Sequence, residues 1–174
     1  MDLSLPQAYL IGLLVLLGSA AVLVARQLIR VRRDESALAR LESAGGDAQN
    51  DPAHLYELGS VQLRKRLYGQ AIDSLKRASR CSNSEPPEAQ ALIENALGFA
   101  IAAQGDYAAA IKHYRAALKA KADYPVALNN LAFALEKQQK AEEAKATYEQ
   151  VLQLDSSNRT AQKRLKRLER IAAA

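Results

Sequence analysis

The chain is 174 residues long, which is the length of one ordinary domain. Alanine and leucine far outnumber valine, isoleucine and threonine, so the composition favours helices over strands. The single cysteine excludes a disulfide framework and leaves too few thiols for a zinc or iron–sulfur site. The net charge of +5 is modest but uneven, because a weakly acidic stretch, residues 34–156, lies between two basic segments.

The first predicted element is a membrane-spanning helix. No charged residue occurs from Leu3 to Ala25, and a helix of that length covers about 35 Å, enough for a hydrocarbon core of about 30 Å. A cleaved signal peptide would carry positive charge ahead of the apolar run, but only the acidic Asp2 precedes it. A buried core helix would show a polar face, which this run lacks. We therefore expect residues 1–33 to form a single-span anchor with a basic flank.

The basic flank predicts the orientation of the anchor. Four arginines follow the span: Arg26, Arg30, Arg32 and Arg33. The positive-inside rule places them on the cytoplasmic or stromal side, with Met1 across the membrane. The same arginines are suited to pair with anionic lipid headgroups.

Residues 34–50 are expected to connect the anchor to a soluble region. Apolar residues keep a helical spacing beyond the span as far as Ser43, so the helix should continue past the bilayer. Gly45 and Gly46 favour its end, and residues 45–50 are interpreted as a short linker. We expect soluble structure to begin near Asp51.

The rest of the chain contains an internal repeat. A leucine followed by a small residue occurs at 58–59, 97–98 and 131–132, and an alanine follows each pair at 71, 110 and 144. The pattern resembles the tetratricopeptide repeat, a 34-residue helix–turn–helix unit. The second and third copies are offset by one such unit, whereas the offset between the first two copies is longer by five positions, an insertion that we place within 82–88.

We predict three such repeats at about 52–85, 91–124 and 125–158, which together form a domain at 51–158. The second repeat departs from the usual pattern because Glu94 occupies a position that is usually large and apolar. The small residues allow the two helices of a repeat to approach closely, and stacked repeats bury faces that no single repeat can bury alone.

A basic helix at 159–174 is expected to cap the stack. Asn158 is a favourable N-cap, and one face of the helix is apolar, formed by Ala161, Leu165, Leu168 and Ala172. The predicted fold is therefore all-α: an N-terminal transmembrane helix, a three-repeat tetratricopeptide α-solenoid and a C-terminal capping helix.

The other faces of the capping helix are basic, and three interpretations of them remain open. The basic residues are Arg159, Lys163, Arg164, Lys166, Arg167 and Arg170. They favour a solvated cap, or a surface for an acidic partner or an anionic lipid surface. Nucleic acid is less well supported, because no aromatic residue is interleaved with them and no recognised motif is present.

The sequence contains no recognisable catalytic arrangement. His54 and His113 lie far apart in the sequence and on different repeats, and neither a P-loop nor an HExxH motif occurs. We expect no enzymatic activity, no catalytic residues, no metal site and no cofactor.

Binding is the natural use of this architecture, because the first helices of stacked repeats line a concave groove. Counting along each repeat gives these candidate groove residues: Tyr56, Ser60 and Arg64, then Asn95 and Phe99, then Asn129, Phe133 and Lys137. The two asparagines are one repeat apart, and so are the two phenylalanines. They either pack locally or form a ladder, in which amides bond the backbone of a bound peptide and phenyl rings hold its side chains.

One well-known groove function is disfavoured. Repeats that bind chaperone tails use a clamp of Lys, Asn, Asn, Lys and Arg across consecutive first helices. Here Tyr56 and Ser60 occupy the positions of the first Lys and Asn.

Over essentially its full length the chain resembles a known family, the small membrane-anchored tetratricopeptide proteins of cyanobacteria and plastids that assist photosystem I assembly. The resemblance lies in the order of span, repeats and basic tail, and in local matches at residues 32–33, 56–59, 70–72, 127–132, 148–152 and 161–164. It implies a non-enzymatic assembly or stability factor on the thylakoid membrane, with its repeats facing the cytoplasm or stroma. The implied partners are photosystem I subunits or assembly intermediates, with no small-molecule substrate.

Two other functions remain open. The same architecture suits a membrane-anchored adaptor that serves another membrane protein complex or protein translocation. A lipid- or nucleic-acid-binding protein would instead act through its two basic segments.

Overall fold

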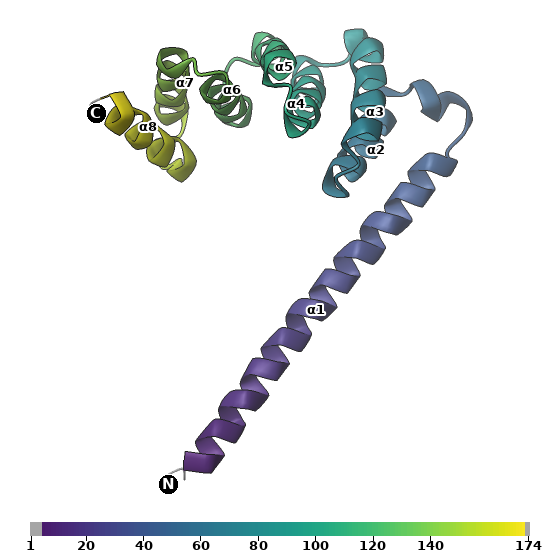
Figure 1. The fold of residues 1–174 in the computed structure, drawn as a ribbon. Helices are drawn as coiled ribbons and strands as arrows, with labels where there is room; N and C mark the ends of the chain where they lie inside the picture. Colours follow the sequence, from purple (N-terminus) through teal and green to yellow (C-terminus); the bar gives the residue numbers. More distant parts are fainter. Residues whose placement is uncertain (1–4, 173–174) are drawn as a thin grey trace. The chain divides into compact units, whose positions relative to one another are not determined.

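The computed structural model describes residues 5–172, and all of their regular structure is helical. By packing, the chain divides into two units, Met1–Arg40 and Leu41–Ala174, which are described separately below. The predicted all-α fold, a tetratricopeptide solenoid preceded by a long apolar helix, is confirmed (Figure 1).

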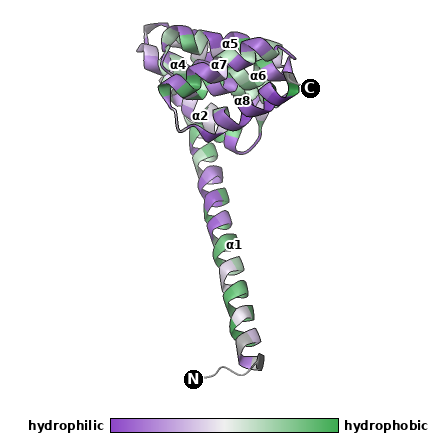
Figure 2. Cartoon of the chain, turned by 90° about the vertical axis from the view of Figure 1, so that its left-hand side faces the viewer, coloured by the Kyte–Doolittle hydropathy of each residue, from purple (hydrophilic) through white to green (hydrophobic). Residues whose placement is uncertain are grey.

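The long N-terminal helix α1 spans Leu5–Ser43. Its segment Tyr9–Ser43 contains an 18-residue window of mean hydropathy 2.1, none of it buried, and this is the one described helix long and apolar enough to cross a bilayer. Figure 2 shows hydrophobic residues concentrated in its N-terminal part and hydrophilic residues in its C-terminal part. The first two residues of the predicted run, at 3 and 4, lie outside the described part.

The segment that follows α1 is more ordered than the predicted linker. α1 ends at Ser43, as expected, but Gly46–Asn50 forms a turn of 3₁₀ helix, η1. Gly46 adopts a positive φ of 66°, which glycine allows without steric cost. Asp51 then caps the next helix by accepting hydrogen bonds from the backbone N–H groups of Ala53 and His54.

Three antiparallel helix pairs follow. The first helices of the pairs are α2 (Pro52–Arg64), α4 (Pro87–Ala103) and α6 (Pro125–Lys137), and the second helices are α3 (Tyr68–Cys81), α5 (Tyr107–Ala120) and α7 (Ala141–Leu154). Each first helix begins with proline, whose missing N–H is harmless there. The five extra residues are accommodated by a 3₁₀ turn, η2 (Ser82–Ser84), and by the start of α4 at Pro87.

Small residues set the close approach within each pair. A Cβ added to Gly98 would lie 2.8 Å from the ring of Tyr114 and 3.2 Å from the carbonyl oxygen of Ala110. The same addition at Gly59 would lie 2.6 Å from Cγ of Leu75. Because van der Waals contacts need more space than this, the helices of the first two pairs pack more closely than an alanine would allow.

The last helix, α8 (Arg159–Ala172), packs on the end of the stack. Its predicted N-cap is confirmed, because Oδ1 of Asn158 accepts a hydrogen bond of 3.1 Å from the backbone N–H of Ala161. Ala161 and Leu168 are buried and Leu165 packs against the core, as expected for the apolar face of α8. The fourth residue predicted for that face, Ala172, has a side chain outside the described part.

Candidate partner-binding groove

The first helices α2, α4 and α6 form a row through the repeat array, and α8 continues that row by its contacts with α6. One repeat length beyond Ala127 and Leu131 of α6 stand Ala161 and Leu165 of α8. Both alanines are fully buried and both leucines pack in the same core. α8 therefore occupies the place of the first helix of a fourth repeat, and its exposed residues stand in line with the predicted groove positions.

The α2 end of this row carries an apolar pocket of about 110 Å³. Its lining comes from α2, from the residue that follows η2 and from the first half of α4: Pro52, Ala53, Tyr56, Glu85, Ala89, Leu92 and Ile93. Leu92 is 42% exposed, so a large aliphatic surface is open to a ligand there. Tyr56, a predicted groove residue, lines the pocket and also packs against both parts of the core.

The two predicted amides differ in their surroundings. Oδ1 of Asn95 accepts a hydrogen bond of 3.0 Å from Asn130, and its Nδ2 donates to the hydroxyl of Tyr124 at 3.4 Å. Asn129, in contrast, has a buried Oδ1 with no hydrogen-bond partner among the described residues. An unpaired buried acceptor is costly, and because this oxygen has almost no accessible surface, it is not open to a ligand in this conformation of the side chain.

The two predicted phenylalanines differ in a similar way. Phe99 is 48% exposed and offers an open apolar face. Phe133 is half-buried and meets the ring of Tyr107 edge to face at 6.1 Å. The amino group of Lys137 lies 5.5 Å from the centre of the Phe133 ring, and the guanidinium of Arg164 lies 4.7 Å from it. Phe133 is thus the platform for two cations, one from α6 and one from α8.

A charged cluster at Glu136 joins α6 to α8. The carboxylate is only 9% exposed; it accepts a hydrogen bond of 3.2 Å from Arg164 and makes an ion pair with Arg167. The hydroxyl of Tyr148 lies 3.4 Å from the same carboxylate. Burial raises the pKa of Tyr148 to about 12, so this hydroxyl is neutral at physiological pH and donates to Glu136.

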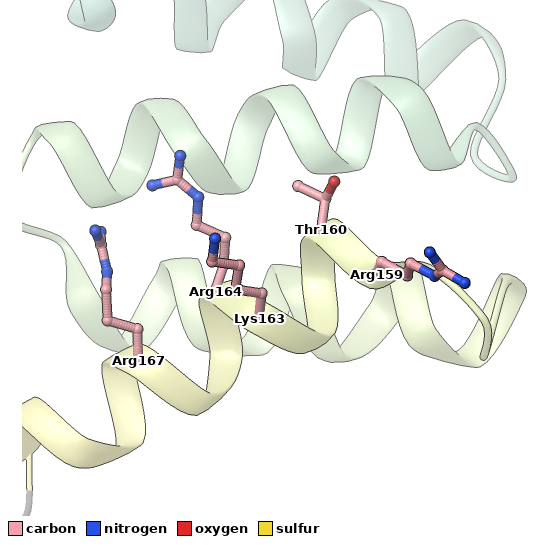
Figure 3. A pocket seen from close by; sticks show the side chains of 5 residues that line it. All are labelled: Arg159, Thr160, Lys163, Arg164 and Arg167. Atoms are coloured by element: carbon pink, nitrogen blue, oxygen red, sulfur yellow. The ribbon is translucent and has the colours of Figure 1, made fainter. Parts of the chain in front are cut away.

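The α8 end of the row is an open basic depression of about 420 Å³. Its lining residues are Arg159, Thr160, Lys163, Arg164 and Arg167 (Figure 3). Figure 3 shows that all five come from one side of α8. Four cations thus line the depression, and among the described residues the one carboxylate that pairs with any of them is that of Glu136.

The basic helix and the groove are predicted as separate features, and the structure brings part of them together. The signal was present in the sequence, because Lys163 and Arg167 lie one repeat length beyond Asn129 and Phe133. The repeat pattern does not mark α8 as a first helix, because α8 lacks the small residue of the other first helices and has Lys166 in its place. Lys166 and Arg170 are exposed on α8 but do not line the depression.

The remaining predicted residues are spread along the chain. Ser60 is half-exposed and Arg64 is exposed, and the Arg64 guanidinium lies 3.4 Å from the Ser60 carbonyl oxygen. The four arginines of the predicted membrane flank, residues 26, 30, 32 and 33, are exposed on α1.

A polar cluster between α3, α4 and α5 explains the unusual Glu94. The Glu94 carboxylate accepts hydrogen bonds from Nδ1 of His113 at 2.8 Å and from Oγ of Ser79 at 2.5 Å. Burial raises the pKa of Glu94, but the two hydrogen bonds and the charge of His113 outweigh it and hold the pKa below 4.5. The position that is usually apolar is therefore filled by a satisfied carboxylate.

Over the described residues, no group of three His, Cys, Asp or Glu side chains is arranged to hold a metal ion. The structure presents two separate pockets in the repeat array, an apolar one at α2 and α4 and a cationic one on α8.

Comparison with known proteins agrees with this description. The family model of the tetratricopeptide repeat matches residues 102–168. The chain is 30% identical over 165 residues to the protein ycf37 of Guillardia theta, in a match that covers 95% of this chain and 93% of the relative. It is 34% identical over 165 residues to the tetratricopeptide repeat domain-containing protein PYG7, chloroplastic, of Arabidopsis thaliana, covering 94% of this chain and 54% of that relative.

Solved structures support the fold. The first tetratricopeptide domain of Spaghetti (RPAP3), solved with an HSP90 peptide, matches with a TM-score of 0.64 and 24% identity, covering 72% of this chain and 98% of that one. MamA from Desulfovibrio magneticus RS-1 (residues 41 to the end) matches with a TM-score of 0.73 and 17% identity, covering 86% of this chain and 82% of that one.

The solenoid and its groove define a tetratricopeptide-repeat scaffold, a class of protein that binds other proteins. The near full-length match to the Guillardia protein shows more: this chain belongs to the ycf37 family, and the family resemblance seen in the sequence is confirmed.

Proposed function

We propose that the protein is a non-enzymatic assembly or stability factor for photosystem I, tethered to the thylakoid membrane by α1. In this proposal the groove between α2 and α8 holds photosystem I subunits or assembly intermediates. The repeats face the cytoplasm or stroma, and the N-terminus lies in the lumen.

The observation that carries the proposal is the family match over nearly the whole chain, anchor helix and repeats together. An Arabidopsis relative that matches 94% of the chain is described as chloroplastic, which supports a role in a photosynthetic membrane. The exposed apolar α1 supports membrane attachment, since a helix with so much exposed aliphatic surface is stable in lipid and not in water.

Deletion of the gene tests the proposal. We expect selective loss of photosystem I, read by low-temperature chlorophyll fluorescence, with photosystem II retained. The wild-type gene should restore the photosystem I signal. An unchanged photosystem I level in the deletion strain would contradict the proposal and favour an adaptor for another membrane complex.

Complementation with groove variants separates binding from folding. Phe99→Ala removes a ring that is about half exposed, so it should reduce co-purification of photosystem I precursors several-fold while leaving the core intact. Leu154→Ala removes an apolar side chain of similar exposure at the end of α7, away from the groove, and serves as the matched control. Equal recovery of precursors with both variants would argue against the groove as the binding surface.

A further inference from the structure

The two ends of the groove differ in chemistry. The pocket at α2 and α4 is almost wholly apolar, and the one ionisable side chain in its lining besides Tyr56 is the acidic Glu85. The depression on α8 is lined by four cations and Thr160. A ligand that fits both ends must therefore differ in polarity along its length, with an apolar side chain at one end and negative charge at the other.

The cations on α8 are held in place and are only partly neutralised. Glu136 pairs with Arg164 and Arg167, and Arg164 also lies on the Phe133 ring. Within the described part of the chain no carboxylate pairs with Arg159 or Lys163. One buried carboxylate therefore orders two arginines, while the cluster as a whole keeps an excess of positive charge, a pattern suited to capture carboxylates.

The length of the row fits an extended segment. First helices that pack side by side are about 10 Å apart, so the distance from α2 to α8 across α4 and α6 is on the order of 30 Å. An extended peptide rises about 3.3 Å per residue, which corresponds to about nine residues. Between the two ends, Phe99 offers an exposed apolar face to such a segment.

We propose that the groove binds an extended acidic segment of a partner protein, with its carboxylates on Arg159, Lys163 and Arg167 and an apolar side chain in the pocket beside Leu92. This inference rests on the proposed use of the groove for protein partners, and it specifies the chemistry of the segment and the direction in which its charge must lie. Lys137, above Phe133, extends the cationic region from α8 onto α6.

Selection from a library of random peptides, each about 12 residues long to span the groove, tests the proposal. The full-length chain in neutral detergent is the bait, at an ionic strength of ~0.15 M so that only nearby charges act on the peptide. We expect the selected peptides to be enriched in Asp and Glu at one end and to carry a large apolar residue several positions away. Selected peptides without an acidic bias would overturn the inference, and would leave the proposed role in photosystem I assembly standing.

Matched charge reversals locate the acidic end. The double variant Arg159→Glu with Lys163→Glu should weaken binding of a selected peptide by about tenfold or more, since two charge-assisted contacts are lost together. Lys166→Glu with Arg170→Glu makes the same change in charge on the same helix outside the depression, and should weaken binding no more than about twofold. Equal losses in the two double variants would show unspecific attraction to a basic helix, and would overturn the site.

The apolar end has its own matched pair. Leu92→Asp places a charge in the pocket and should weaken binding of the same peptide severalfold, whereas Leu154→Asp alters an exposed leucine outside the groove and should not. Circular dichroism of each variant confirms that the helices are intact. Full binding by Leu92→Asp would overturn the assignment of the apolar end.

Discussion

At the scale of single residues, the most informative departure from the repeat pattern is Glu94. Its carboxylate sits where a large apolar residue is usual, and the structure explains it by the hydrogen bonds from His113 and Ser79. No sequence rule predicts this, because the two partners are distant along the chain and come together only when α3 and α5 pack against α4.

The Glu94 cluster predicts a pH-dependent stability. Because its folded pKa lies below the ordinary 4.5, the carboxylate contributes stability that is present above pH 4.5 and is lost as the pH falls through the folded pKa. We expect Glu94→Gln to lower the free energy of unfolding by about 1–3 kcal/mol at neutral pH. The deficit should shrink as the pH falls below 4.5.

Urea unfolding of the full-length chain, followed by circular dichroism at about pH 7 and at about pH 3.5, measures this difference. Glu149→Gln, at an exposed position on α7, is the control and should have little effect at either pH. A deficit for Glu94→Gln that is the same at both pH values would contradict the assigned role of the carboxylate.

At the scale of elements, the three repeats turn from first to second helix through the same strained conformation. The residue at this turn has a positive φ in each repeat: 60° at Arg66, 91° at Gly105 and 59° at Gln139. Only the second repeat has glycine there, and the left-handed conformation costs a residue with a Cβ about 1–2 kcal/mol. The sequence pattern predicts the turns. In two of them, however, the residue with positive φ carries a Cβ, which makes that backbone conformation sterically unfavourable.

We therefore expect Arg66→Gly and Gln139→Gly each to raise the free energy of unfolding by about 0.5–1 kcal/mol, the relief of strain being partly offset by the greater freedom of glycine in the unfolded chain. Gly105→Ala should lower it by about 1 kcal/mol. Urea midpoints of the three variants check the prediction. Destabilisation by both glycine substitutions would show that side-chain contacts of Arg66 and Gln139 outweigh the strain.

At the scale of the whole molecule, different physical features determine the two units of the chain. The predicted role of the N-terminal unit as a membrane anchor depends on hydropathy and on the four arginines that follow the apolar run. The repeat unit is governed by packing, with one continuous core from α3 to α8. The proposed function needs both, a tether of defined orientation and a groove of defined chemistry.

The orientation of the tether is tested by protease treatment of sealed thylakoid vesicles. We expect a tag at the C-terminus to be digested from the stromal side and a tag at the N-terminus to be protected. Replacing Arg26, Arg30, Arg32 and Arg33 by glutamine should reduce the fraction of correctly oriented chains, whereas replacement by lysine should preserve it. Protection of the C-terminal tag in the unaltered protein would reverse the proposed topology.

The sequence by itself determined the fold class, the extent of the apolar run, the number of repeats and the N-cap at Asn158, because these depend on local composition and on periodic spacing. Tertiary structure decided how the candidate site is assembled. It engaged Asn95 with Asn130 and Tyr124, left an acceptor of Asn129 without a partner among the described residues, and placed Arg164 of α8 on the Phe133 ring of α6. The physical reason is that hydrogen bonds, ion pairs and ring contacts between helices depend on how neighbouring repeats pack. The period of the sequence predicts which face of a helix a residue lies on, but it does not specify the residue's partners.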